Sequence, residues 1–120
     1  MTNVFDENKP IYLQIMDLIK KQLITSELQS GGRLPSVRGL SKHLEVNPNT
    51  VQRAYTEMER EMLTITKRGQ GTFIVDEPEM ISRLREEMVR DKLTTFVKEM
   101  EEFGFSHDEL LKRMEEYLSE

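Results

Sequence analysis

The sequence contains no cysteine among its 120 residues. This absence excludes disulfide bonds and thiolate metal sites, and it is typical of proteins in a reducing compartment. Long apolar runs are also lacking, because Asp or Lys interrupts each of them, so no segment is expected to span a bilayer. The first ten residues have neither the basic start nor the apolar run of a signal peptide. We therefore expect a small soluble protein of the cytoplasm that has no membrane partner.

Patterns that support catalysis or metal binding are missing as well. The two histidines, His43 and His107, stand far apart in the chain and have no further ligand at metal spacing. The sequence has no Gly-rich phosphate loop, no nucleophile elbow and no catalytic His–acid constellation. The eight methionines suit core packing better than a cofactor site. We predict that the protein is not an enzyme and uses neither a metal nor a cofactor.

Positive charge is scarce overall, since the chain carries a net charge of −5, but the two signs are unevenly distributed. Residues 1–75 carry ten Lys or Arg and eight Asp or Glu, a net charge of +2. Residues 76–120 carry seven and fourteen, a net charge of −7. The acidic part is therefore excluded as the surface that meets a phosphate backbone. The charge of the first part permits DNA binding without demanding it.

The first periodic segment predicts a helix from about Pro10 to Glu27. Proline suits the first turn of a helix, because its missing N–H would have no partner there. Apolar residues then recur at helical spacing, namely Ile11, Ile15, Leu18, Ile19 and Leu23. The segment Ser30-Gly31-Gly32 is expected to end this helix and to open a loop that runs to Pro35.

Two short helices are predicted after this loop. Ser36 is a suitable N-cap for a helix over 37–44, and Asn47 is a suitable N-cap for a helix that begins at Pro48 and runs to about Glu61. The few residues between the two helices leave room only for a tight turn. Two short helices joined in this way form the helix-turn-helix pattern.

After this pattern the hydrophobic period changes from that of a helix to that of a strand. Residues 63–66 alternate, residues 72–75 are β-branched and aromatic, and the segment 67–71 between them contains two glycines that can turn the chain. A hairpin with a basic tip directly after a helix-turn-helix is a wing. We therefore predict an α+β, mainly α fold, in which residues 1–76 form a winged helix-turn-helix domain.

The rest of the chain, residues 77–120, is predicted to be a helical dimerisation region. A long helix is expected over 78–103, Gly104 ends it, and Ser106 with Glu109 forms a capping box for a last helix. Two helices alone cannot bury the apolar stripes that both carry, so we expect a homodimer about a two-fold axis. The residues predicted to form its interface are Ile81, Leu84, Met88, Leu93, Phe96, Met100, Phe103, Leu110, Leu111, Met114, Tyr117 and Leu118.

The helix over 48–61 carries two different faces. One is expected to pack against the fold, and it consists of Val51, Ala54, Tyr55, Met58 and Met62. The other, which we call the polar quartet, consists of Asn49, Gln52, Arg53 and Thr56. Amide and guanidinium groups hydrogen-bond the edges of adenine and guanine, so the polar quartet favours reading of DNA bases over an ordinary solvated helix face. Asn47 is more typical of a cap than of a base reader, and Thr50 either touches a phosphate or completes the cap.

Further basic residues are candidates for contacts with the DNA backbone. Arg33 and Arg38 could neutralise phosphates, and the alternative for each is a free surface arginine. Lys67 and Arg68 in the wing could reach the backbone or a minor groove, whereas an ordinary hairpin tip is the alternative. The complete predicted DNA-binding set is Arg33, Ser36, Arg38, Asn47, Asn49, Thr50, Gln52, Arg53, Thr56, Lys67, Arg68, Gly69 and Gly71.

Three stretches, residues 34–40, 47–55 and 69–75, resemble the GntR family of bacterial regulators, and the Asn-Pro-Asn-Thr-Val run from Asn47 resembles its YtrA subfamily. The resemblance implies a homodimer on a pseudo-palindromic operator, usually a repressor, often of genes for membrane transporters. By motif position, Arg38 and Gly71 correspond to DNA-contacting residues of the family, as does the start of the helix over 48–61.

These observations predict a sequence-specific regulator whose partners are double-stranded operator DNA and a second copy of itself. The helix with the polar quartet would enter the major groove, the wing would contact the flanking backbone or minor groove, and the tail would set the half-site spacing. One alternative is a winged helix that binds another protein. A second alternative is a regulator that senses a small-molecule effector, of unknown identity, in the helical dimer region.

Overall fold

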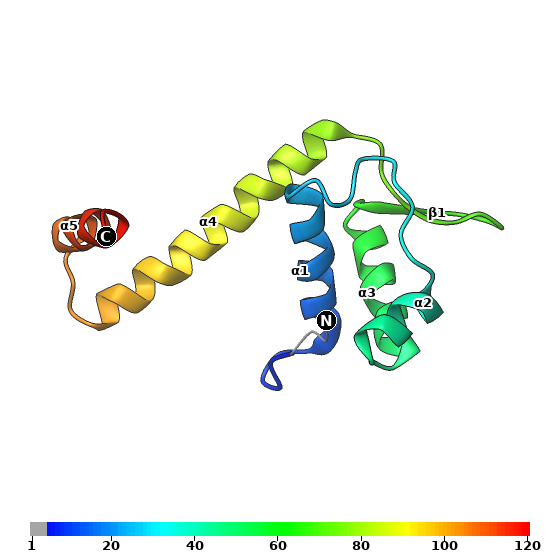
Figure 1. Cartoon of the computed structure of the whole chain (residues 1–120), viewed down its shortest axis with the longest axis horizontal. Helices are drawn as coiled ribbons and strands as arrows, with labels where there is room; N and C mark the ends of the chain where they lie inside the picture. Colours follow the sequence, from blue (N-terminus) through cyan, green and yellow to red (C-terminus); the bar gives the residue numbers. More distant parts are fainter. Residues whose placement is uncertain (1–4) are drawn as a thin grey trace. The chain divides into compact units, whose positions relative to one another are not determined.

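The computed structural model describes residues 5–120, so the expectation drawn from the first ten residues falls partly outside the described part of the chain. Its elements in order are α1 (Ile11–Ile24), α2 (Val37–Leu44), α3 (Pro48–Arg60), β1 (Thr64–Lys67), β2 (Gly71–Ile74), α4 (Pro78–Glu102) and α5 (His107–Leu118) (Figure 1). The two strands form one antiparallel sheet. The predicted α+β, mainly helical fold with a hairpin wing is confirmed.

The chain divides into two compact units, Met1–Leu84 and Arg85–Glu120, and the division lies inside α4. The first unit includes the start of α4 because Met80 and Leu84 are buried. Its limit therefore lies beyond Asp76, the last residue of the domain predicted from the sequence. Among residues 5–120, no helix combines the length and the apolar character that crossing a membrane requires.

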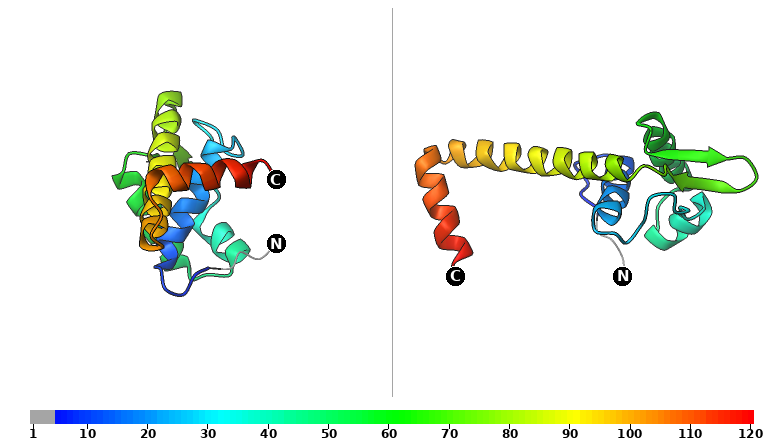
Figure 2. Two further views of the ribbon diagram at one scale, coloured as in Figure 1. Left: turned by 90° about the vertical axis from the view of Figure 1, so that its left-hand side faces the viewer. Right: turned by 90° about the horizontal axis from the view of Figure 1, so that it is seen from above.

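The core of the first unit lies between α1 and α3, which lie side by side, with α2 against α3 (Figures 1 and 2). The buried side chains of α1 are Ile15, Met16, Ile19 and Leu23. Those of α3 are Val51, Ala54, Tyr55 and Met58. α1 ends earlier than the sequence predicts, because Ser26 adopts a left-handed φ of 66° that a helix cannot continue through.

The two predicted caps of the helix-turn-helix are confirmed. Ser36 Oγ accepts a hydrogen bond from the Gly39 amide at 3.0 Å, and Asn47 Oδ1 accepts one from the Asn49 amide at 2.8 Å. Between the helices, the Ser41 hydroxyl donates to the Val46 carbonyl at 2.6 Å. The position of α3 is also held by Tyr55, whose hydroxyl donates to the Pro35 carbonyl at 2.8 Å.

The wing is wider than the predicted hairpin, because part of the preceding loop pairs with it. β1 and β2 pair in the register Thr64↔Ile74 to Lys67↔Gly71. In addition, the Leu34 amide donates to the Thr72 carbonyl and the Ile74 amide donates to the Gly32 carbonyl, both at 2.8 Å. Arg33 thereby forms an antiparallel bridge with Phe73.

The second unit contains the rest of α4 and all of α5. Gly104 has a φ of +87°, and the turn that it makes lets the Phe105 amide donate to the Met100 carbonyl at 3.2 Å. The predicted capping box then starts α5: Ser106 Oγ accepts from the Glu109 amide, and Glu109 Oε1 accepts from the Ser106 amide, each at 3.2 Å. Hydrogen bonding of the Glu109 carboxylate to the Ser106 side chain and to the Ser106 backbone amide lowers the pKa of Glu109 below its ordinary value.

Candidate nucleic-acid interface

The polar quartet lies on the exposed side of α3. Its members, Asn49, Gln52, Arg53 and Thr56, are all exposed, whereas the buried residues of the helix lie on the opposite side. Gln52 and Thr56 are joined by a hydrogen bond of 3.3 Å between Nε2 and Oγ1. The face therefore presents amide, guanidinium and hydroxyl groups to solvent, which are the groups that hydrogen-bond base edges.

One residue of the predicted packing face does not pack. Met62 lies beyond the end of α3 and is 78% exposed. Its φ of 66° turns the chain toward β1, so the helical spacing that would have placed Met62 above Met58 no longer applies.

The three acidic residues near the end of α3 all have hydrogen-bonding or ion-pair partners. Glu57 pairs with Arg60 at 2.9 Å, and Glu61 pairs with Lys20 of α1 at 3.2 Å. Glu59 accepts a hydrogen bond from the Thr66 amide of β1 at 3.1 Å. Glu61 and Glu59 thereby hold the end of α3 to α1 and β1, whereas the Glu57–Arg60 pair lies within α3. None of the three carboxylates belongs to the polar quartet.

Arg53 is held by an aromatic ring of another helix. Its guanidinium carbon lies 3.9 Å from the centroid of Tyr12 in α1. The two side chains border a hollow of about 390 Å³, whose other lining residues are Pro10, Ile11, Asn47, Asn49 and Thr50. The sequence pattern does not single out Tyr12, because the whole of α2 separates it from Arg53 along the chain.

The wing brings a second group of predicted residues together. Lys67 Nζ lies 4.6 Å from the centroid of the Phe73 ring. The Arg33 side chain lies over Gly71, where an added Cβ would come within 3.0 Å of Arg33 Nε. Gly71 has a φ of +120° and Gly69 one of +77°, so both use the conformational freedom of glycine. Arg33, Lys67 and Arg68 are all exposed.

The remaining predicted DNA-binding residues have the following places. Arg38 is exposed on α2. Ser36 and Asn47 are N-caps and are also exposed. Thr50 is half-buried at the start of α3. The hollow beside Tyr12 is lined by four predicted DNA-binding residues, namely Asn47, Asn49, Thr50 and Arg53. Arg33 belongs to the wing instead.

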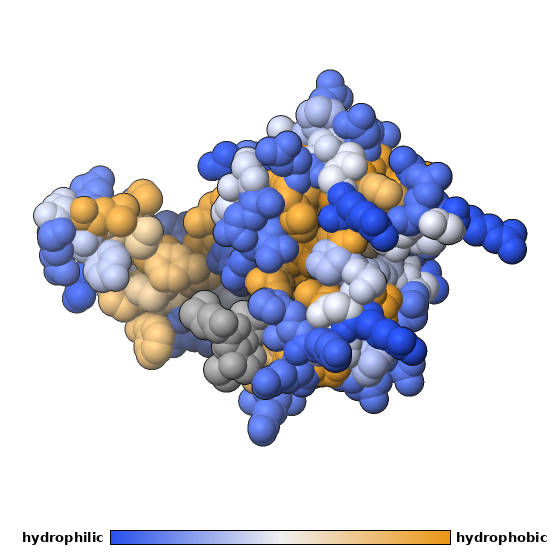
Figure 3. All heavy atoms as spheres, turned by 45° about the vertical axis from the view of Figure 1, so that its right-hand side comes forward, coloured by the Kyte–Doolittle hydropathy of each residue, from blue (hydrophilic) through white to orange (hydrophobic). Residues whose placement is uncertain are grey.

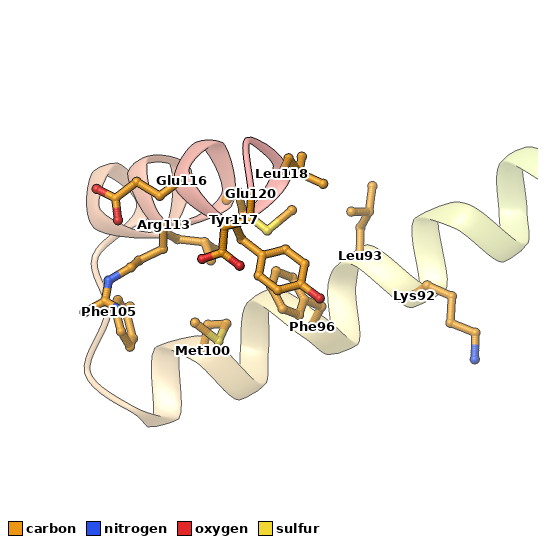
Figure 4. A pocket seen from close by; sticks show the side chains of 12 residues that line it. Lys92, Leu93, Phe96, Met100, Phe105, Arg113, Glu116, Tyr117, Leu118 and Glu120 are labelled. Carbon is orange, nitrogen blue, oxygen red and sulfur yellow. The ribbon is translucent and has the colours of Figure 1, made fainter.

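The second unit exposes a large apolar surface. Its exposed large apolar side chains are Val89, Leu93, Phe103, Leu111, Tyr117 and Leu118. Figure 3 shows orange, hydrophobic residues at the surface of this unit, in the left-hand part of the picture. A groove of about 720 Å³ lies between α4 and α5, and Figure 4 shows Tyr117 reaching from α5 toward α4, where Phe96 and Met100 lie.

The predicted interface residues fall into three groups. Leu84 and Leu110 are buried within the single chain, so they serve its own packing. Five are exposed, namely Leu93, Phe103, Leu111, Tyr117 and Leu118. Five are half-buried, namely Ile81, Met88, Phe96, Met100 and Met114.

In the part of the chain that the structure describes, no three His, Cys, Asp or Glu side chains come together in a way that could hold a metal ion.

Comparison with known proteins gives concordant matches. Residues 11–74 match the family described as bacterial regulatory proteins, gntR family. The uncharacterized HTH-type transcriptional regulator YhcF of Bacillus subtilis is 53% identical over 77 residues, which cover 64% of each chain. The HTH-type transcriptional repressor YtrA of the same organism is 46% identical over 65 residues, which cover 54% of this chain and 50% of YtrA.

A solved structure extends the similarity to nearly the whole chain. It is a GntR family transcriptional regulator from Listeria monocytogenes, with a TM-score of 0.87 and 34% sequence identity over 93% of this chain and 98% of that one. The two Bacillus subtilis relatives are matched over only 64% and 50% of their own lengths.

Proposed function

The chain belongs to the GntR family of bacterial regulatory proteins, and on this premise we propose that it represses transcription by binding a pseudo-palindromic operator as a homodimer. Its relatives are helix-turn-helix transcription regulators and not enzymes, and the chain is a regulator of the same kind.

The observation that carries the proposal is the polar quartet on a capped helix whose other side is anchored in the core. A rigid helix with an exposed amide and guanidinium face fits the major groove of B-DNA. Lys20 and Arg60 compensate the charges of Glu61 and Glu57, which reduces the repulsion that these carboxylates would exert on phosphates near this face. We assign base reading to the polar quartet.

The cations around α3 suit contacts with the DNA backbone. Lys67 and Arg68 at the wing would contact the flanking backbone or minor groove, together with Arg33 beside Gly71. Arg38 on α2 would neutralise a phosphate at the rim of the groove. The segment 76–120 has a net charge of −7, so it would be repelled by the duplex.

The apolar groove and exposed side chains of the second unit support dimerisation. A two-fold axis would bury the same surface of both copies, and two copies of α3 would then meet two half-sites, as a pseudo-palindromic operator requires. Repression would follow when the bound dimer covers a promoter, and the name of the relative YtrA, a transcriptional repressor, supports this direction. The family resemblance further suggests a transporter operon as the target, and a protein of the cytoplasm.

The experiment that tests the proposal is selection of bound fragments from a pool of random duplex DNA, followed by a salt titration of the selected duplex. We expect an enriched motif with two inverted half-sites and an affinity that falls steeply with added salt. An enriched motif without inverted half-sites would contradict the dimer. The absence of duplex affinity even at low salt would contradict DNA binding and favour a winged helix that binds protein.

The groove in the second unit favours one additional role, the binding of a small apolar effector. Its volume of about 720 Å³ and its lining of Leu93, Phe96, Met100, Met114 and Tyr117 suit a compact apolar molecule. Thermal shifts against a panel of metabolites would detect such a ligand. A hit that also releases the selected duplex would identify it as an inducer, whereas a hit without release would assign the groove no regulatory role.

A further inference from the structure

We infer that Tyr12, on α1, is a positioning residue for DNA recognition: its ring holds the Arg53 guanidinium in place on the reading face of α3. This inference rests on the proposed function, because it assigns a role in reading DNA. The observation behind it is the contact between the two side chains, with the guanidinium carbon 3.9 Å from the ring centroid.

A ring face is a suitable holder for an arginine that must bind something else. In a stacked pair, the guanidinium lies over the ring and its N–H groups point outward in its own plane. All five N–H donors therefore stay available for a base edge or a phosphate. Since Tyr12 is uncharged, it holds Arg53 without neutralising its positive charge.

Other cations near α3 are held in a different way. Lys20 pairs with Glu61, and Arg60 pairs with Glu57. Among residues 5–120, Arg53 has no carboxylate partner, and the hollow that it borders with Tyr12 contains no acidic side chain. Binding of DNA by Lys20 or Arg60 would first require breaking an ion pair, whereas Arg53 is ready to donate.

Tyr12 itself has a firm support. The Gln14 side chain accepts from the Asp6 amide at 2.8 Å and donates to the carbonyls of Asp6 and Lys9 at 2.7 and 2.9 Å, which fixes the chain that leads into α1. Ile15, in the next turn, is completely buried against the core. Because the start of α1 is held in place, the Tyr12 ring restricts the Arg53 side chain before DNA binds. Arg53 therefore loses less conformational entropy on binding.

The first measurement uses the free protein. The Arg53 Nε–Hε resonance in an NMR spectrum should carry the upfield shift that an aromatic ring imposes on a proton above its face. Tyr12→Phe should keep this shift and Tyr12→Leu should remove it. An Arg53 resonance that is the same in all three proteins would overturn the stacking.

The second measurement is a double-mutant cycle on the affinity for the selected duplex. Tyr12→Leu should weaken binding about two- to fivefold, the range that an exposed cation–π contact supports, and Tyr12→Phe should bind like the wild type. The loss should disappear in an Arg53→Ala background. In the matched Gln52→Ala background it should persist, because Gln52 shares the polar quartet but bonds to Thr56 and does not line the hollow that Tyr12 and Arg53 border.

The outcomes separate this inference from the proposed function. If the wild type binds a selected duplex but Tyr12→Leu causes the same loss with and without Arg53, only the positioning role fails. An equal loss for Tyr12→Phe and Tyr12→Leu would assign the effect to the hydroxyl and overturn the role of the ring. If the wild type binds no duplex at all, the proposed function fails, and the inference fails with it.

Discussion

Two arginines of α3 differ in their surroundings although they lie on the same helix. Arg53, a member of the polar quartet, contacts the ring of Tyr12. Arg60 forms an ion pair with Glu57 near the end of the helix. Their contributions to DNA binding should differ accordingly, because Arg60 lies about two turns beyond Arg53 in the last turn of the helix and its charge is already paired with Glu57.

Arg53→Ala is therefore expected to weaken binding to the selected duplex by about 1–3 kcal/mol, as for an arginine that reads guanine. It should also reduce the preference for that duplex over a scrambled one. Arg60→Ala removes the same charge and should change the affinity by less than about 0.5 kcal/mol. Fluorescence anisotropy with both duplexes measures the two effects. An equal loss for the two variants would mean that only the charge of α3 matters.

Tyr55 shows how a single buried hydroxyl makes the fold depend on pH. Burial raises the pKa of Tyr55 from 10.0 to about 12, and its hydroxyl donates to the Pro35 carbonyl. The unfolded chain therefore releases this proton at a lower pH than the folded chain does. The stabilising contribution is complete below pH 10 and is lost as the pH rises toward 12.

Tyr55→Phe should lower the free energy of unfolding by about 0.5–1.5 kcal/mol near neutral pH, because one hydrogen bond is lost. Between pH 10 and 12 the difference between wild type and variant should shrink. Urea unfolding followed by circular dichroism at several pH values measures this difference. If the difference in free energy of unfolding between wild type and variant stays constant from pH 10 to 12, ionisation of Tyr55 does not cause the loss of stability at alkaline pH.

The conformation of the wing depends more on glycine at position 71 than on glycine at position 69. Gly71 has a φ of +120°, outside the small left-handed region that other residues adopt, and an added Cβ would crowd Arg33. Gly69 has a φ of +77°, and nothing lies within 4 Å of a Cβ added there.

Gly71→Ala should therefore destabilise the protein by about 1–3 kcal/mol, the cost of a strained backbone conformation. Gly69→Ala should destabilise the protein less, because its φ lies closer to the left-handed region and an added Cβ would meet no other atom. Urea unfolding gives both values. Anisotropy with the selected duplex should show a larger loss for Gly71→Ala, because the displaced Arg33 belongs to the same surface. Equal effects would indicate that the wing adjusts freely.

The whole molecule carries more apolar surface than one chain can cover. The second unit buries Leu110 but leaves Leu93, Leu111 and Leu118 exposed. A second copy would remove this surface from water, and the free energy gained would join two DNA-binding units.

Leu93→Glu is expected to dissociate the proposed dimer, because it would place an unpaired carboxylate in an apolar interface. Affinity for the selected duplex should fall by about a hundredfold or more when one half-site contact is lost. The matched control is Thr94→Glu, which adds the same charge to the next exposed position, about 100° around α4 from Leu93 and outside the predicted interface set. Sedimentation velocity measures the mass. A Leu93→Glu protein that remains dimeric would place the interface elsewhere.

Local sequence patterns were sufficient for the elements themselves. Ser36, Asn47 and the Ser106–Glu109 pair cap the helices that the sequence predicts, because a cap depends only on residues within one turn. The change of period after α3 predicts the hairpin for the same reason. The amide and guanidinium residues of the polar quartet could likewise be grouped by helical spacing alone.

Contacts between distant segments required the packed fold. The bridge of Arg33 to Phe73, the contact of Arg33 with Gly71 and the stack of Arg53 on Tyr12 each join residues that no local period relates. Helical spacing predicts that Met62 is buried, but it is exposed, because α3 ends at Arg60 and the chain turns at Met62. Which side chains meet across the molecule depends on how α1, α3 and the wing pack, and this packing is a property of the assembled core.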